Sequence, residues 1–522
     1  MKKPFFNCDA TVWNMDLWPL WLCYLWVCVA PFLSLYRVGP LPSFYLETGS
    51  LLGAVMLVLF TAVEGRLKTK IPTVSVVLLV LAAFWWLQAR VMGLVFPGMN
   101  DMVVWTFIIL ALASWACRSW IAEVGQNKVA AVFAWAVCTG ALMQAVVVWL
   151  QFTGVAGQEW LHGLVAFSGK SSVEGQLGQR NHLGHYLMWG VLSASYLWTQ
   201  RRVPNWLGVL LVLVLAATLG LVNSRSIFTY VMGVAILLPI WRLRGGRSAN
   251  RVVVVMLFTL IMVATVQFSI GHVLSWFSDT HYDTALARVG SSGFTMSARD
   301  FEWRKAWLAF QTAPWFGHGW GGYALQSFLI NVYPDGYNNN LLSVLFTHAH
   351  NIVLHLLSEM GLVGTVLVFA GFVMALWRMF RRPLSDASLL MLAMMTVSMC
   401  HSMLEYPLWY IYFLTPFVLM AALSPADEKD KVATIRAGKW QNYSLLVASV
   451  FLAVGLARLS MVYTDLIDFS VENSKDSEQE VHRKIAGLQR IVNTEPLLRY
   501  YAELSLVRKA DAAGSSVYPW AE

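Results

Sequence analysis

Charged residues are scarce in this sequence. They make up 13% of its 522 residues, whereas soluble domains contain about 25%, and 58% of the residues are hydrophobic. The formal net charge of +8 is not gathered on a basic face of a soluble domain, which argues against nucleic-acid binding. The composition therefore excludes an ordinary soluble protein and predicts an all-α, polytopic integral membrane protein.

Cysteine and metal-binding patterns are also sparse. Only six cysteines are present, mostly in or beside apolar runs, where we expect packing residues and no exported disulfide. The sequence has no HExxH motif and no cysteine cluster, so no metal site is predicted. Its Gly-rich stretch at 317–322 is not followed by Lys-Ser/Thr, which excludes a Walker phosphate-binding loop.

Long apolar runs are abundant instead. A helix of roughly 20 residues crosses a hydrocarbon core of about 30 Å, and many runs approach that length. The first run is long, rich in Trp and without a small-residue cleavage pattern, so no cleavable signal peptide is predicted. We expect about thirteen transmembrane helices in a GT-C-like arrangement, near residues 17–36, 47–64, 72–89, 102–117, 129–152, 182–199, 206–222, 226–241, 252–274, 361–377, 387–404, 407–424 and 442–463.

Basic residues are distributed asymmetrically between alternate loops. With Met1 inside, the predicted inner loops carry Arg66, Lys68, Lys70, Arg118, Lys128, Arg201, Arg202, Arg242, Arg244, Arg247, Arg251, Arg378, Arg381, Arg382, Lys429, Lys431, Arg436 and Lys439. The short outer loops carry only Arg37, Arg90, Lys170, Arg180 and Arg225. This alternation follows the positive-inside rule and places the C-terminal Glu522 outside.

The loops divide the sequence into four predicted regions. These are an N-terminal transmembrane bundle at 1–274, a large outer loop region at 275–360, a C-terminal transmembrane bundle at 361–464 and an outer tail at 465–522. All eleven histidines fall outside the predicted spans or at their outer ends, so we expect the chemistry to face the exterior. The tail alternates charged and apolar residues at helical spacing, which predicts a pair of amphipathic helices.

The most informative segment is HAHNIVLHLLSEMGLVG at 348–364, directly after the largest polar loop. Polar groups at such a junction with the membrane indicate a functional site. His350 and Asn351 begin the spacing HN-x9-G-x-x-G, and in a helix His350 would share a face with Leu354. Imidazole titrates near neutral pH, so we expect His350 to act as a general base, with a structural histidine as the alternative. His348 is too close in sequence to form a helical metal-binding pair with it.

Two shorter outer segments also concentrate polar side chains. The QLGQRNHLGHY segment carries Gln179, Arg180, Asn181 and His182, more hydrogen-bonding groups than a helix cap requires, although capping and snorkelling are the alternative. Arg225 lies in a very short turn, VNSRS, between two apolar runs. A guanidinium group binds phosphate oxygens in bidentate fashion, so Arg225 suits a diphosphate at the membrane surface, with an interfacial anchor as the alternative.

Two more segments complete the candidate site. Arg299 and Arg304 fall on neighbouring faces of a predicted helix, before a Gly-rich turn whose aromatic side chains would stack on sugars or form an interfacial belt. These aromatic residues are Trp315, Trp320 and Tyr323. In HSMLEYPLWYIY, Glu405 and Tyr406 lie between two apolar runs, where an outer turn explains Pro407 but not a carboxylate and a phenol together.

These segments together resemble a known enzyme family. The HN-x9-G-x-x-G spacing after a large loop is similar to the signature of the O-antigen ligase and polymerase superfamily (Wzy_C), whose members take glycans from undecaprenyl diphosphate on the periplasmic face. Within it, GQRNHLGHY, NSRS, PWFGHGW, THAHN and HSMLEYPLWYIYF resemble the pilin-glycosylating O-oligosaccharyltransferases of the Neisseria PglL type, over residues 10–515. Such enzymes usually carry a longer periplasmic tail, whereas this sequence ends at Glu522, as a truncation or a shorter natural form.

The resemblance assigns roles to residues already singled out. The family's essential histidine corresponds to His350, its conserved loop Gln to Gln179, and the Tyr of its EYPLW motif to Tyr406. The arginines that hold the lipid diphosphate correspond to Arg225 and Arg299. We expect Arg180 to assist these arginines, and Asn181, His182, His348, Asn351, Glu405 and Trp320 to position the substrate.

The resemblance also implies a reaction and its location. A glycan would move en bloc from undecaprenyl diphosphate to Ser or Thr of an exported protein such as type IV pilin, at the periplasmic face of the bacterial inner membrane. His350 would accept the hydroxyl proton, and the arginines would neutralise the diphosphate that leaves. The reaction requires no metal or cofactor, and besides the donor and the acceptor protein the only expected partner is membrane lipid.

Three alternatives stay open at the level of the sequence. An O-antigen ligase would use lipopolysaccharide core as the acceptor, and an O-antigen polymerase would use a growing glycan. The EYPLW segment and the exported tail favour a protein acceptor. A secondary transporter would place polar residues near the membrane midplane and often shows inverted repeats, whereas here the polar residues cluster at one face and no repeat is present.

Overall fold

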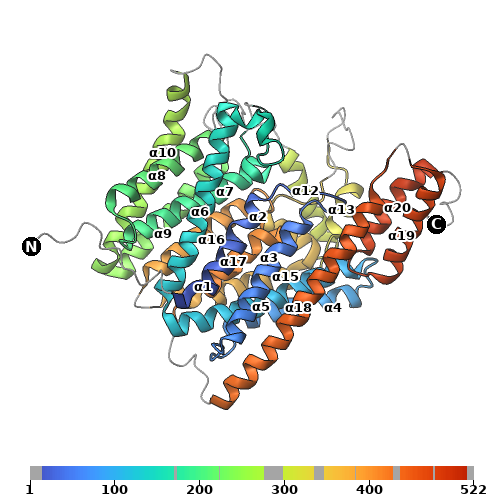
Figure 1. Cartoon of the computed structure of the whole chain (residues 1–522), viewed down its shortest axis with the longest axis horizontal. Coiled ribbons are helices and arrows are strands. Elements are labelled where there is room, and N and C mark those ends of the chain that lie inside the picture. Colours follow the sequence, from blue (N-terminus) through green and yellow to red (C-terminus); the bar gives the residue numbers. More distant parts are fainter. Residues whose placement is uncertain are drawn as a thin grey trace, which may run out of the picture.

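The computed structural model describes residues 15–513, except 168, 170–172, 223, 276–297, 334–345, 382–383, 427–434 and 474–475. These residues form α-helices and short 3-10 helices joined by loops (Figure 1). Several predictions fall outside the described residues: the inner Met1, Lys2 and Lys3, loop residues Lys170, His281, Arg382, Lys429 and Lys431, much of the large loop region, and the tail beyond 513.

The helices follow the order of the apolar runs. They are α1 (Trp18–Cys28), α2 (Ala30–Leu33), α3 (Phe44–Val63), α4 (Thr73–Val91), α5 (Pro97–Val124), α6 (Gln126–Thr153), α7 (Arg180–Thr199), α8 (Asn205–Leu221), α9 (Ser226–Gly245), α10 (Asn250–Ser275), α12 (Ala298–Thr312), α13 (Gly322–Leu329), α15 (Ile352–Leu376), α16 (Asp386–Ser402), α17 (Ile411–Ala422), α18 (Ile435–Ser470), α19 (Glu478–Thr494) and α20 (Arg499–Ala513).

A helix occupies each of the predicted transmembrane ranges. Among the described residues, eight helices are long and apolar enough to cross a membrane, namely α3, α4, α5, α6, α9, α10, α15 and α18. Three shorter apolar helices, at Trp18–Leu33, Asn205–Leu221 and Ile411–Ala422, fall below that length. These helices support a multi-pass, all-helical membrane protein, while the number of thirteen crossings stays a prediction.

The largest hydrophobic core combines helices from both ends of the sequence. It includes residues of the predicted 1–274 and 361–464 bundles, which therefore pack as one body. α7 and α16 lie inside this body, where the Trp189 indole donates a 2.9 Å hydrogen bond to the Met394 carbonyl. Four of the cysteines, Cys23, Cys28, Cys117 and Cys138, are buried without a disulfide, as expected for packing residues.

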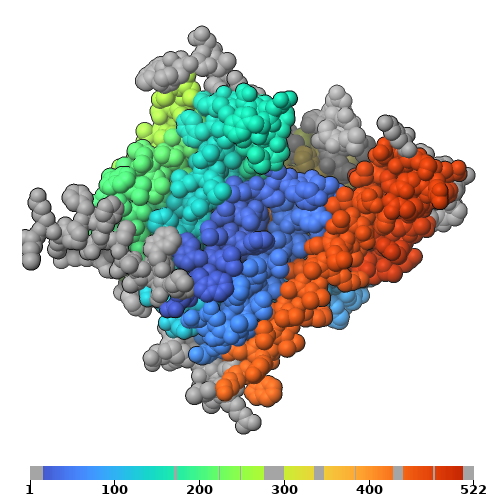
Figure 2. All heavy atoms as spheres, in the orientation of Figure 1, coloured from blue at the N-terminus to red at the C-terminus, as the bar shows by residue number. Residues whose placement is uncertain are grey.

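The tail packs against the side of the bundle. α18 runs beside α3, and α19 and α20 form a hairpin against the end of α18, at the right-hand edge of Figures 1 and 2. The two predicted tail helices are thus present. A second core ties the tail to the start of α3, with Phe44 stacked on Tyr463 at 3.8 Å between ring centroids. At Gly98 of α5, any Cβ would overlap the Pro496 carbonyl, so only glycine permits this close approach.

Candidate functional site

The glycines of the HN-x9-G-x-x-G spacing create a close backbone contact. Gly361 has φ 63°, a left-handed conformation that breaks α15 into two segments. A Cβ at this position would overlap the Trp315 carbonyl, and one at Gly364 would lie 2.8 Å from the Phe84 ring of α4. Gly361 therefore permits the close contact between α15 and the loop after α12, and Gly364 permits the one between α15 and α4.

The same loop is hydrogen-bonded along its length to α15. The amides of His318 and Gly319 donate to the carbonyls of Ser358 and Glu359, at 2.9 and 2.8 Å. Across the break, the amide of Leu362 donates to the Pro314 carbonyl at 2.8 Å. α12 and α13 are thereby held at the top of α15, next to the segment that carries His350.

His350 lies before α15 and not within it. Asn351 is the N-cap, and its side-chain oxygen accepts the amides of Val353 and Leu354, each at 3.1 Å. His350 itself has φ 52°, so the prediction that it shares a helical face with Leu354 is wrong. Asn351, which is predicted to position the substrate, precedes the helix as its cap, and its side-chain amide donates to the Met403 carbonyl at 3.4 Å.

Glu405 is the centre of the site. Its carboxylate accepts a hydrogen bond from the Arg299 guanidinium and one of 3.0 Å from the Asn181 amide. Its other oxygen lies 3.5 Å from Nε2 of His350. Asn181 in turn accepts a 2.8 Å hydrogen bond from the Ser224 hydroxyl. Three segments that are far apart in the sequence, from α7, α12 and the entry to α15, therefore converge on the buried carboxylate of Glu405, which is 7% exposed. The turn before α9 joins them through Asn181.

Each ring nitrogen of His350 faces an acceptor. Nδ1 lies 3.0 Å from the His348 carbonyl, and Nε2 lies 3.5 Å from the Glu405 carboxylate. A general base requires the neutral tautomer with its proton on Nδ1, in which Nε2 is the basic nitrogen. Burial lowers the pKa of His350, and the Glu405 carboxylate opposes this effect in part. A neutral imidazole at physiological pH is the form that a general base requires.

Tyr406 and His348 form an aromatic wall beside His350. The His348 ring stacks on Tyr406 with a centroid distance of 4.2 Å and an interplanar angle of 10°. The His350 ring meets the same tyrosine edge-on at 5.1 Å. Burial raises the pKa of the Tyr406 phenol, so it remains a hydrogen-bond donor, and burial lowers the pKa of His348.

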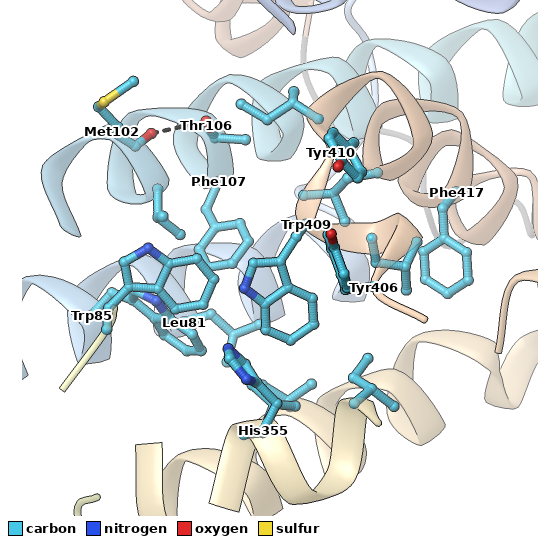
Figure 3. A pocket seen from close by; sticks show the side chains of 18 of the residues that line it. Leu81, Trp85, Met102, Thr106, Phe107, His355, Tyr406, Trp409, Tyr410 and Phe417 are labelled. Atoms are coloured by element: carbon cyan, nitrogen blue, oxygen red, sulfur yellow. Dashed lines mark hydrogen bonds between the residues drawn. The ribbon is translucent and has the colours of Figure 1, made fainter. Parts of the chain in front are cut away.

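A cavity of about 660 Å³ extends from this wall between α4, α5, α15 and α17 (Figure 3). Its lining includes His348, Tyr406 and His355, and Trp320 stacks on Trp409 within it, with 5.6 Å between the ring centroids and 5° between the ring planes. Most of the remaining lining is apolar and includes Leu78, Leu81, Phe107, Val368, Phe372, Leu414 and Phe417. At the rim the tail contributes Tyr500 and Tyr501. The cavity thus has a mostly apolar body with a few polar and aromatic side chains in its lining.

Three more of the predicted residues, Gln179, Arg180 and Arg225, lie at the starts of α7 and α9. Gln179 is the N-cap residue of α7 and Arg180 its first residue, one position before Asn181. Arg225 is exposed at the start of α9, directly after Ser224.

Three other predicted residues, His182, Trp315 and Tyr323, differ in how exposed their side chains are. His182 is buried one turn deeper, with its ring 5.1 Å from those of Tyr410 and Phe413. Trp315 is exposed, whereas Tyr323 is fully buried, which excludes sugar stacking by Tyr323.

Two polar residues of this region were missed in the sequence. His355 and Glu359 lie one turn apart on α15, are 3% and 1% exposed, and approach each other at 3.4 Å. A histidine and a carboxylate at i and i+4 in an otherwise apolar helix could have revealed them, because ionisable groups in such helices need a partner.

Comparisons with known proteins agree with this arrangement. Residues 209–369, which include Arg225, Arg299 and His350, match the family model described as O-antigen ligase. Residues 389–522, which include Glu405 and Tyr406, match the model described as the C-terminal part of a membrane-bound virulence-factor polymerase. These matches support the O-antigen ligase superfamily and not the PglL type in particular.

One curated relative is also similar. The chain is 23% identical over 324 residues to a general O-oligosaccharyltransferase of Acinetobacter baylyi. The alignment covers 60% of this chain and 53% of the relative, so the chain spans about half the length of the protein it matches.

Proposed function

We propose that this protein is an O-linked oligosaccharyltransferase that moves a glycan en bloc from a lipid diphosphate to Ser or Thr of an exported protein. The observation that carries the proposal is the convergence of a histidine, a guanidinium group and a carboxylate beside Tyr406, which lines a mostly apolar cavity. The donor we propose is undecaprenyl diphosphate oligosaccharide, and the site faces the periplasm of the inner membrane.

The diphosphate is proposed to bind beside Glu405. The N-termini of α7 and α9 meet here through the hydrogen bond from Ser224 to Asn181, and helix N-termini attract anions. Arg180 and Arg225 begin these two helices, and Arg299 approaches from α12. Arg299 has five donor hydrogens, so it can hold Glu405 and a phosphate oxygen together. These arginines neutralise the charge that develops on the leaving diphosphate.

The polyprenyl chain is proposed to fill the apolar body of the cavity. The lining comes largely from α4, α5, α15 and α17, and the isoprenoid would lie among these helices with its headgroup near Tyr406. Burying apolar surface contributes about 25 cal/mol per Å². Tyr406 and His355 lie close to Trp409 (Figure 3), and we propose that the chain ends and the sugar begins beside these rings. Trp320 and Trp409 provide flat aromatic surfaces for the sugar at this point.

His350 is proposed to activate the acceptor. As the Ser or Thr oxygen attacks the anomeric carbon, Nε2 of His350 takes the hydroxyl proton and the bond from the anomeric carbon to the phosphate oxygen breaks. Undecaprenyl diphosphate leaves with the electron pair. Glu405 then faces a protonated His350 and stabilises it. Gln179 and Tyr406 orient the sugar or the diphosphate through their hydrogen-bonding groups.

A protein acceptor is proposed because the tail reaches the cavity. Tyr500 and Tyr501 place α20 at the rim, so an exported protein docked on the tail could extend a Ser-containing segment toward His350. Co-expression with a lipid-linked glycan pathway and a candidate pilin tests the proposal, with intact pilin mass as the measurement. A gain of one whole glycan supports it. Unmodified pilin together with glycan on lipopolysaccharide core, or with longer glycan chains, would assign the protein to the ligase or polymerase alternative.

A further inference from the structure

We infer that His355 and Glu359 form a positioning pair that fixes the backbone on which His350 is presented. The inference rests on the proposed function of His350 as the base. Neither residue is among those predicted from the sequence. Both act through the peptide at Ala349, which separates His348 from His350.

The protonation of His355 follows from its two neighbours. Nδ1 accepts the Ala349 backbone N–H at 3.3 Å, so this nitrogen carries no proton. The proton of the neutral ring is therefore on Nε2, which lies 3.4 Å from the Glu359 carboxylate. The carboxylate favours this tautomer and makes Nδ1 a better acceptor for the amide, as in carboxylate–histidine pairs that orient catalytic groups.

Glu359 is itself held on both sides. The second oxygen of its carboxylate accepts the Tyr323 amide at 3.1 Å, and its carbonyl accepts the Gln88 side-chain amide at 2.9 Å. The Tyr323 hydroxyl donates a 2.7 Å hydrogen bond to the Glu302 carboxylate, and Glu302 forms an ion pair with Lys305 at 3.0 Å. A buried polar network from α12 to α15 thus ends at the Ala349 amide.

The position of this amide matters to His350. The His348 carbonyl, one residue earlier, accepts the Nδ1 proton of His350, and the His355 ring stacks on that of His348 at 5.1 Å and 19°. His350 has φ 52°, a conformation that a non-glycine residue keeps only where its surroundings over-determine it. Loss of the amide anchor would release the segment and move Nε2 away from the reacting hydroxyl.

Substitutions at His355 separate this role from simple packing. In His355→Asn the side-chain oxygen occupies the place of Nδ1 and can still accept the Ala349 amide. In His355→Gln the acceptor is displaced toward the place of Nε2, and His355→Phe keeps the flat ring without an acceptor. With saturating lipid-linked donor, we expect kcat to fall by roughly 10- to 100-fold in the Gln and Phe variants and to stay within about fivefold of wild type in the Asn variant.

A second measurement is independent of transfer. Carbethoxylation of His350 by diethyl pyrocarbonate, followed by mass spectrometry of its peptide in the substrate-free protein, reports the exposure and protonation of Nε2. We expect His350 to react severalfold faster in the Gln and Phe variants, and at the wild-type rate in the Asn variant. Equal reactivity in all proteins, or an Asn variant that behaves like Phe, would overturn the inference. If wild type transfers no glycan, the proposed function fails, while the carbethoxylation pattern still decides the role of His355.

Discussion

This protein contains two clusters of three histidines, and the two clusters have different surroundings. The core histidines, His182, His185 and His401, lie in α7 and α16 among aromatic rings. There Nδ1 of His185 is 3.0 Å from that of His401, and its Nε2 is 3.0 Å from the Ser398 hydroxyl. The loop histidines, His348, His350 and His355, lie where the polar loop meets α15, and two of them face a carboxylate.

The comparison shows what distinguishes a reactive histidine in a membrane protein. Both groups are polar, and both lie near the predicted outer ends of spans, so position along the sequence does not separate them. The difference is that Glu405 and Arg299 accompany His350, and that His348 and His355 line the cavity. The core histidines contact one another, a serine and aromatic rings, an environment that holds α7 against α16.

The largest expected effect comes from removing the base. His350→Ala should lower transfer by about 10²- to 10⁴-fold, the usual contribution of a positioned general base, without loss of expression or membrane insertion. The measurement is the glycosylated fraction of pilin in co-expressing cells. His185→Gln is the matched control from the core histidines, and it should retain most transfer while lowering thermal stability. Comparable losses in the two variants would erase the distinction between the groups.

Substitution of the arginines should have the next largest effect. Arg225→Lys keeps the charge but not the bidentate fork, so we expect donor binding to weaken by about tenfold, with a larger loss in Arg225→Ala. Binding of undecaprenyl diphosphate glycan to detergent-purified protein measures this directly. Wild-type affinity in the Ala variant would remove Arg225 from the donor site and leave Arg299 and Arg180 as its cationic partners.

The glycine that breaks α15 offers a test of the scaffold beneath the loop histidines. Gly361→Ala places a side chain at φ 63° and against the Trp315 carbonyl, so we expect a loss of at least about 1–3 kcal/mol of stability from the backbone conformation. Thermal unfolding of the purified protein measures it. Gly455→Ala in α18 is the control, because no atom lies within 4 Å of its added Cβ and alanine favours the helix. Equal unfolding temperatures for the two variants would contradict the structural role of Gly361.

A shift in the pH dependence of transfer should be the smallest of these effects. His350 acts as a base only when neutral, and its pKa is lowered by burial, so transfer should persist below the ordinary histidine value of about 6.5 and fall as pH decreases through the lowered pKa. Glu405 raises the pKa of His350, so Glu405→Gln should shift the acidic limb of the normalised kcat profile to still lower pH. A shift to higher pH would mean that another group controls the limb.

Much of the fold and the site was predictable from the sequence because long apolar runs indicate membrane helices. The sequence indicates Asn181, His350 and Glu405 as polar groups at the ends of apolar runs and Arg299 as part of the large outer loop region, and the structure brings the four together. Their mutual contacts were not predictable, because they depend on how α7, α12, α15 and α16 pack.

Two local features also escaped prediction. The spacing after His350 looked helical, but Asn351 caps the helix and leaves His350 outside it, since an N-cap competes with the helix for the same backbone amides. His355 and Glu359 fall in the predicted outer loop region at 275–360 and drew no prediction of their own, and only the folded structure shows that they contact the amides of Ala349 and Tyr323.

The most direct test of the account is an electron cryo-microscopy structure with undecaprenyl diphosphate oligosaccharide bound. The diphosphate should lie among Arg180, Arg225 and Arg299, with the first sugar near His350 and the polyprenyl chain in the cavity between α4, α5, α15 and α17. A donor headgroup bound among the core histidines, or a lipid chain outside that cavity, would contradict the assignment of the loop histidines as the reactive group.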